Sequence, residues 1–88
     1  MKNANSKKLY GKYRGVVTDN RDPKTLGRIR ASVPSVVNRD ELGWALPCVP
    51  CTQNKVDMFF VPNAGSNVWI EFEEGDINKP IFSGCFWG

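Results

Sequence analysis

The stretch V-W-I-E-F-E-E-G-D at residues 68–76 contains the clearest strand pattern in this chain. Apolar side chains recur at every second position in it, and they are Val68, Ile70 and Phe72. Trp69 and two glutamates occupy the positions between and after them. Because the side chains of a β-strand point alternately to its two faces, this pattern predicts a half-buried strand that is apolar inside and acidic outside. The Gly-Asp pair that follows predicts a turn.

Toward the N-terminus the sequence predicts two strands joined by a long loop. Residues 10–18 are rich in Tyr, Val and Thr, which fit a pleated strand. Residues 28–33 alternate strictly between polar and apolar. The apolar face of that second strand carries Ile29, Ala31 and Val33. Residues 19–27 contain Asp, Asn, Pro and Gly, which favour turns, so we expect a hairpin with a long loop.

Three further extended segments complete the pattern, at residues 43–49, 58–61 and 81–87. Pro47 and Pro50 confine the first of them to a sheet edge or an irregular path, because proline cannot donate a hydrogen bond to a neighbouring strand. In the last segment Phe82 and Phe86 fall on one face by simple alternation. This alternation favours a core position for both phenylalanines, with exposure of Phe86 at a subunit contact as an open alternative.

The chain is predicted to be all-β. No ten-residue stretch has a helical period, and turns recur about every 10–15 residues, as in small barrels and sandwiches. Five or six strands in this length favour a small five- to six-stranded Greek-key barrel of the OB type, in which closure hides the strand edges. Residues 1–8 show no periodicity and are predicted to be a flexible N-terminal arm, with residues 9–88 as the barrel domain.

Length and charge limit the classes of protein to consider. The chain has 88 residues, 41% of them hydrophobic, and a net charge of +3. These values fit one small folded domain, which oligomerisation would help to stabilise, and no apolar run approaches the about 20 residues of a membrane span. Residues 1–30 hold nine lysines and arginines against two aspartates, whereas residues 40–88 hold seven acidic residues against two lysines. Such asymmetry is typical of a nucleic-acid surface or of parts that attract one another.

The cysteines do not make a complete site in one chain. Cys48 and Cys51 form a C-x-x-C pair, Cys85 is alone, and the chain has no histidine. Structural zinc commonly takes four ligands, so a single chain cannot complete the set. We expect the cysteines to be small buried groups, with a metal site shared between subunits as an open alternative. Without histidine, Ser and Cys nucleophiles also lose their usual base, and the chain is not expected to be an enzyme.

Three blocks carry a resemblance to a known family. They are G-V-V-T-D-N-R-D-P-K-T-L-G-R-I-R-A-S-V-P at residues 15–34, G-W-A-L-P-C-V-P at residues 43–50, and the run from F-F-V-P-N to G-C-F-W at residues 59–87. In this order they resemble the phage baseplate assembly protein V family, the OB-fold domain of the central spike of contractile phage tails and related injection systems. The resemblance implies folding roles for the turn residues, and neither catalytic residues nor cofactors.

The resemblance implies a structural component that connects tail-hub proteins to a membrane-puncturing tip. The expected partners are two further copies in a homotrimer, the hub protein and the tip or needle protein, with membrane contact only through the tip. The expected location is the tail baseplate of a virion, assembled in the cytoplasm of the host bacterium, or a bacterial contractile injection particle. Family members usually continue into a β-helical needle, and because the sequence stops at Gly88 we expect the needle to be a separate protein.

Subunit contacts are expected at exposed aromatic and basic side chains. The candidate interface residues are Trp69, Phe86, Trp87, Arg28 and Arg30. The same basic strand supports an alternative function, an OB-fold protein that binds single-stranded nucleic acid, since such barrels combine basic grooves with stacking aromatics. The acidic C-terminal half would repel phosphate, so nucleic acid is not the expected partner.

Overall fold

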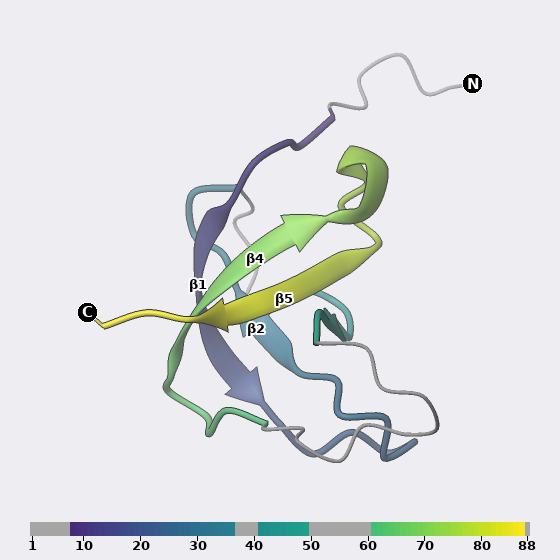
Figure 1. Cartoon of the computed structure of the whole chain (residues 1–88), viewed down its shortest axis with the longest axis vertical. Helices are drawn as coiled ribbons and strands as arrows, with labels where there is room; N and C mark the ends of the chain where they lie inside the picture. Colours follow the sequence, from purple (N-terminus) through teal and green to yellow (C-terminus); the bar gives the residue numbers. More distant parts are fainter. Residues whose placement is uncertain (1–7, 37–40, 50–60, 88) are drawn as a thin grey trace.

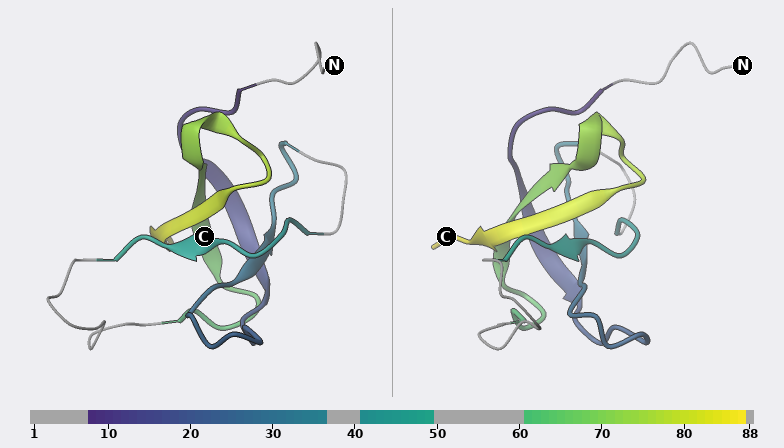
Figure 2. Two further views of the ribbon diagram at one scale, coloured as in Figure 1. Left: turned by 90° about the vertical axis from the view of Figure 1, so that its right-hand side faces the viewer. Right: turned by 45° about the vertical axis from the view of Figure 1, so that its right-hand side comes forward.

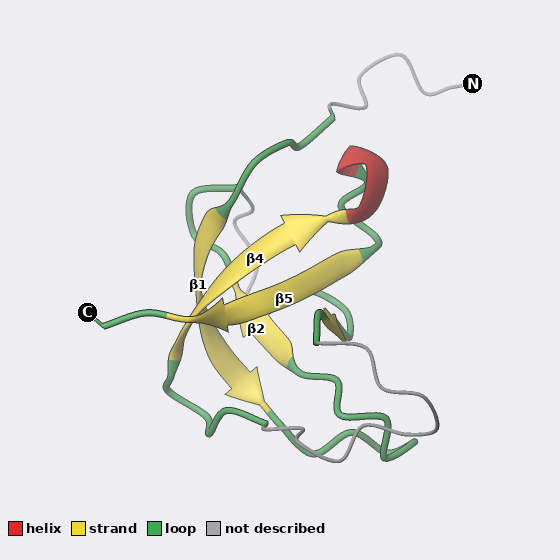
Figure 3. Ribbon diagram, in the orientation of Figure 1, coloured by secondary structure: helices red, strands yellow, loops and turns green. Residues whose placement is uncertain are grey.

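The computed structural model describes residues 8–36, 41–49 and 61–87 (Figure 1). Apart from one short 3₁₀ turn, the regular elements among these residues are strands, which confirms the all-β prediction (Figure 3). In chain order the elements are β1 (Tyr13–Asp19), β2 (Arg30–Ser32), β3 (Leu46–Pro47), β4 (Asn67–Phe72), the 3₁₀ turn η1 (Glu73–Gly75) and β5 (Pro80–Cys85). No helix in the described part of the chain is long and apolar enough to cross a membrane.

The five strands form one sheet in the order β2-β1-β4-β5-β3. β1 pairs antiparallel with both β2 and β4, and β4 pairs antiparallel with β5, so that β1, β4 and β5 lie side by side in Figure 1. β3 alone is parallel to its neighbour, β5. The fourth and fifth strands are thus a hairpin, with β1 on one side of it and β3, which precedes both strands in the chain, on the other.

The two edges of this sheet meet. Ile29, just before β2, forms an antiparallel bridge with Ala45, just before β3. The amide of Ala45 donates to the carbonyl of Ile29 at 2.7 Å, and the amide of Leu42 donates to the carbonyl of Ala31 at 2.8 Å. Figure 2 shows the resulting curled sheet from two further sides, with β3 lying next to β5. The architecture is a small five-stranded OB-type barrel, as the sequence predicts.

The core lies inside the curl and follows the predicted alternation. Val68 and Ile70 are fully buried and Phe72 is 6% exposed. The inward face of the second predicted strand is buried as well, at Ile29, Ala31 and Val33. Each large apolar side chain buried in this way contributes about 1.5–3 kcal/mol of transfer free energy. Continuous burial along β2 and β4 therefore holds the barrel together.

The predicted long-loop hairpin between β1 and β2 is present, and Asp22 organises its loop. The Asp22 carboxylate accepts hydrogen bonds from the backbone amides of Lys24, Leu26 and Arg28, at 2.9, 3.0 and 3.2 Å. The Arg28 side chain adds two more, from Nε at 2.9 Å and from Nη2 at 2.8 Å. These bonds favour the charged form of the carboxyl group, and those from the Arg28 guanidinium have the largest effect. The pKa of Asp22 therefore lies well below its usual range.

Several strand boundaries differ from the prediction. The first strand begins at Tyr13, because Gly11 adopts φ 88° and Leu9 donates its amide to Gly75 O at 2.9 Å instead. The third segment is reduced to β3, where Pro47 cannot donate to a neighbouring strand. The strand predicted at residues 58–61 lies mostly outside the described residues. So does most of the predicted arm, and the boundary between residues 8 and 9 stays a prediction.

A β-bulge overturns the core position that simple alternation predicts for Phe86. Ile70 pairs with Phe82, but Val68 pairs with Cys85, so the register of β4 against β5 shifts by one residue between them. Gly84, in that interval, has φ 140°, a conformation that favours glycine. One extra residue reverses the alternation that follows it. Phe82 is therefore buried as predicted, whereas Phe86 is half-buried on the outer face and is not part of the core.

Candidate functional site

Three side chains form a cluster on the outer face of the sheet, which we name the outer aromatic cluster: Arg14, Trp69 and Phe86. The ring centroids of Trp69 and Phe86 are 4.5 Å apart, with an angle of 37° between the planes. The guanidinium carbon of Arg14 lies 4.9 Å from the Phe86 centroid and 5.5 Å from the Trp69 centroid. Both distances allow a cation–π interaction, which is worth about 0.5–1 kcal/mol at an exposed site.

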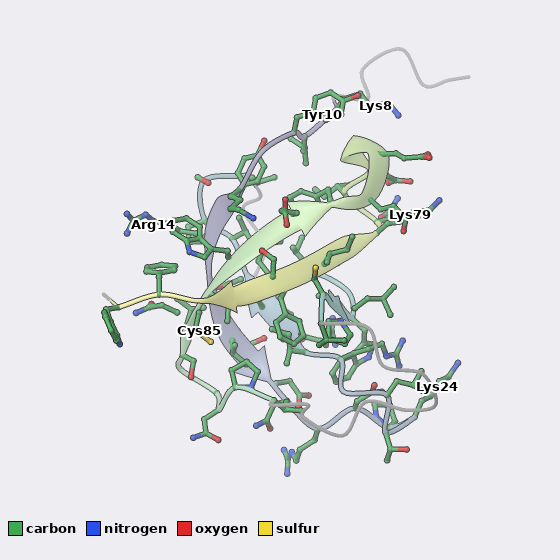
Figure 4. All side chains as sticks on the ribbon, viewed as in Figure 1. Lys8, Tyr10, Arg14, Lys24, Lys79 and Cys85 are labelled. Atoms are coloured by element: carbon green, nitrogen blue, oxygen red, sulfur yellow. The ribbon has the colours of Figure 1, made fainter. Side chains whose placement is uncertain are left out.

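Strand register creates this cluster. Arg14 in β1 is the direct cross-strand partner of Trp69 in β4, so their side chains share the outer face. The bulge at Gly84 then turns Phe86 to the same face. Figure 4 shows Arg14 extending away from the sheet near the end of β5. Three segments, from β1, from β4 and from the end of β5, therefore supply one surface that combines two aromatic rings with a positive charge.

This surface continues into exposed apolar groups. Trp87 follows Phe86 directly and is 98% exposed, and Val16 in β1 is 38% exposed. A shallow hollow of about 260 Å³ lies beside the cluster, lined by Arg14, Gly15, Val16, Pro34, Asn67 and Phe86. A fully exposed tryptophan beside stacked rings is the type of surface that contacts another protein.

A second cluster, the Trp44 cluster, consists of Trp44 with Arg28 and Arg30. Their guanidinium carbons lie 5.5 and 5.7 Å from the Trp44 centroid. Both arginines are also paired with carboxylates, Arg28 with Asp22 at 2.8 Å and Arg30 with Glu41 at 3.0 Å. These two guanidiniums therefore hold the loops of their own chain. A hollow of about 350 Å³ adjoins the cluster, lined by Arg28, Trp44, Leu46, Glu73, Asn78, Lys79 and Pro80.

The structure divides the five predicted interface residues into two groups. Trp69, Phe86 and Trp87 belong to one surface, and Arg28 and Arg30 belong to the Trp44 cluster. The hollow of the Trp44 cluster includes Pro80 at the start of β5, whereas Phe86 follows the end of that strand. Six residues of strand span about 20 Å, so the two groups are separate surfaces.

Sequence reasoning missed two members of these clusters, Arg14 and Trp44. The signal for Arg14 is weak, since nothing in the sequence states that Tyr13–Asp19 pairs with β4 in a register that places Arg14 opposite Trp69. Trp44 lies in a segment with little regular alternation. Its position depends on the bridge between Ile29 and Ala45, which only the closed barrel forms.

The predicted burial of the cysteines is wrong for the two that the structure describes. Cys48 and Cys85 are both exposed, Cys48 directly after β3 and Cys85 at the last position of β5. Cys51 lies outside the described residues. Within residues 8–36, 41–49 and 61–87, no three Cys, Asp or Glu side chains gather as metal ligands would.

The charge asymmetry is partly neutralised inside the chain. Lys12, from the basic half, approaches Glu71 of the acidic half at 3.3 Å. Glu41 accepts a hydrogen bond from Thr18 as well as its ion pair with Arg30. Basic and acidic segments thus meet across neighbouring strands, as the attraction between halves of the sequence suggests.

Comparison with known proteins identifies the family. A search of curated proteins finds no match to the chain. A family model described as the type VI secretion system/phage-baseplate injector OB domain matches residues 13–87, nearly the whole described barrel. Fold and family model agree, because both describe a single OB barrel. The chain belongs to the phage-baseplate and type VI secretion injector OB-domain family.

Proposed function

We propose that three copies of this chain form the collar of a central spike, which joins tail-hub proteins on one side to a membrane-puncturing tip on the other. Family membership assigns the chain a structural role in a baseplate or type VI injector. Our proposal adds to this role the collar, the homotrimer and the two partner proteins. The match over residues 13–87 carries it, since an injector domain works by joining other components.

Surface composition supports association with other subunits. A domain of this size buries only about 60% of the surface that its unfolded chain exposes, so it gains stability from contact with partners. Trp87 is 98% exposed, and Leu46 beside the Trp44 cluster is 49% exposed. These positions fall on the two surfaces described above. We propose both as contact surfaces, including the predicted interface residues Arg28 and Arg30.

The collar belongs to a virion tail baseplate assembled in the cytoplasm of a host bacterium, or to a bacterial contractile injection particle. The proposal assigns no catalytic residue and no cofactor. It also assigns no nucleic acid as partner, because Arg28 and Arg30 each already face a carboxylate. A guanidinium paired in this way has less charge to offer a phosphate.

Sedimentation velocity on the full chain, alone and with the tail-hub protein from the same gene cluster, tests the proposal. We expect a trimer, and a larger complex that contains the hub protein. A monomer that never joins the hub would contradict the collar. Fluorescence anisotropy with a labelled single-stranded oligonucleotide at low salt is the parallel measurement, and tight binding that weakens steeply with added salt would favour the nucleic-acid alternative instead.

A further inference from the structure

Arg14 differs from the other strand arginine, Arg30, in its partners. Arg30 pairs with Glu41, whereas no carboxylate among the described residues approaches the Arg14 guanidinium. Arg14 instead lies against Trp69 and Phe86, at 5.5 and 4.9 Å from their centroids. Stacking on the two rings orients the guanidinium, and within the part of the chain that the structure describes no carboxylate compensates its charge. This is an arrangement that an incoming carboxylate would complete.

A carboxylate that also has no ion-pair partner among the described residues lies in the turn between β4 and β5. Glu74 is exposed, and within the described residues no lysine or arginine pairs with it. Its backbone is left-handed, with φ 53° and ψ 26°, a conformation in which Gly or Asn is ordinarily favoured. Keeping a glutamate there costs about 1 kcal/mol or more, and strained residues of this kind concentrate at functional positions. Glu73 beside it adds a second exposed negative charge.

Arg14 and Glu74 do not meet within one chain. Phe86 follows the last residue of β5, and Glu74 lies in the turn before its first residue. The strand between them has six residues and spans about 20 Å. Figure 4 shows this separation, with Arg14 near the end of β5 and Lys79 beside the turn. Arg14 on β1 and Glu74 in the turn between β4 and β5 can therefore pair with each other only between copies, head to tail.

We propose that the outer aromatic cluster of one copy receives the Glu73–Gly75 turn of the next copy, with Arg14 forming an ion pair with Glu74. Charge complementarity selects a second copy of this chain as the occupant. Trp87, at 98% exposure, packs against the same turn and removes water from around the ion pair. A contact between two different patches is heterologous, so it closes into a ring when the rotation allows. The inference rests on the proposed trimer and adds which surfaces join it.

Charge reversal of the two residues tests this pairing. The variants are Arg14→Glu, Glu74→Lys and the double variant that carries both, with Lys24→Glu as the matched control. Lys24 is an exposed residue of the β1–β2 loop that lies away from Arg14 and from Lys79 beside the Glu73–Gly75 turn in Figure 4, and its substitution makes the same charge change as Arg14→Glu. Sedimentation velocity of each full-length variant across a wide concentration range reports the trimer, and far-ultraviolet circular dichroism reports the fold.

We expect each single variant to raise the trimer dissociation constant at least tenfold, while the control keeps the wild-type constant. The double variant restores assembly, because the reversed charges again face each other. If both single variants still trimerise like the wild type, this pairing is wrong and the proposed trimer stands. If the single variants dissociate and the double variant does not recover, Arg14 and Glu74 contact other groups and the pairing is equally wrong. A wild-type chain that never trimerises removes the proposed collar itself.

Discussion

Arg28 binds Asp22 through two side-chain hydrogen bonds, from Nε to Oδ2 at 2.9 Å and from Nη2 to Oδ1 at 2.8 Å. The Asp22 side chain is 3% exposed and the Arg28 side chain 17%. The pair thus lies inside the β1–β2 loop although the loop is on the surface. The same guanidinium lies over Trp44 from the segment before β3, so one residue connects the first hairpin to the closing strand.

Asp22→Asn should lower the melting temperature by several degrees. Asparagine keeps the shape of the side chain, but its amide nitrogen cannot accept the bonds that Oδ1 or Oδ2 now accept, and the ion pair with Arg28 is lost. Lys24→Ala is the control, since only the backbone amide of Lys24 takes part. Thermal unfolding followed by circular dichroism measures both. Equal melting temperatures for Asp22→Asn and the wild type would contradict the role given to this carboxylate.

Lowering the pH should remove the stabilisation that the charged Asp22 carboxylate provides. The folded pKa of Asp22 lies below its ordinary value of 3.8, so the stabilisation is complete above the unfolded pKa and is lost as the pH falls toward the folded pKa. The difference in unfolding free energy between the wild type and Asp22→Asn should be constant above about pH 5, and should shrink steadily below about pH 4. Urea unfolding at a series of pH values measures it. If the difference in unfolding free energy grows as the pH falls, the Asp22–Arg28 ion pair does not stabilise the fold in the way described.

Gly15→Ala should destabilise the barrel by about 1–3 kcal/mol, because the added methyl group overpacks a filled space. A Cβ at Gly15 would lie 3.0 Å from Ile70 Cγ1 and 3.1 Å from the carbonyl oxygen of Ser32. Gly43→Ala is the matched control, since a Cβ there meets nothing within 4 Å. Chemical denaturation of the two variants gives the comparison. Equal stabilities would show that β1 and β2 can separate without cost.

Thr25→Asn should stabilise the protein by about 0.5–1 kcal/mol. Thr25 adopts φ 51°, which is unfavourable for a β-branched residue, whereas asparagine tolerates this region well. The side chain is exposed, so little packing is lost. A rise of a few degrees in melting temperature is expected for a domain of this size. A fall would mean that the hydrogen bond from Thr25 Oγ1 to Lys24 O outweighs the strain.

Gly84→Ala should disturb the outer aromatic cluster more than the core. A Cβ has room at this position, but φ 140° is strained for alanine, so relief of the strain favours loss of the bulge. Phe86 would then leave Trp69. We expect destabilisation of about 1–3 kcal/mol and a change in the near-ultraviolet circular dichroism of the tryptophans. Gly43→Ala again serves as control, and an unchanged aromatic spectrum would show that Gly84 does not position Phe86.

Local patterns in the amino-acid sequence are enough to predict several elements of this fold. The alternation of Val68, Ile70 and Phe72 places these side chains in the core, because a period of two leaves a strand only one apolar face. The turn residues between β1 and β2 predict the long loop, because Asp and Pro set the backbone locally. The order of the three sequence blocks was enough to indicate the family, which the family model confirms.

The places where surface side chains meet depend instead on how the strands pair in three dimensions. The cluster of Arg14, Trp69 and Phe86 requires one strand register and one bulge, and a single extra residue at Gly84 reverses the face of everything after it. The pairing of Ile29 with Ala45 that closes the barrel joins residues 16 positions apart, which no local pattern encodes. Local sequence periodicity sets which face of a strand is apolar, whereas the contacts between faces depend on how the strands align.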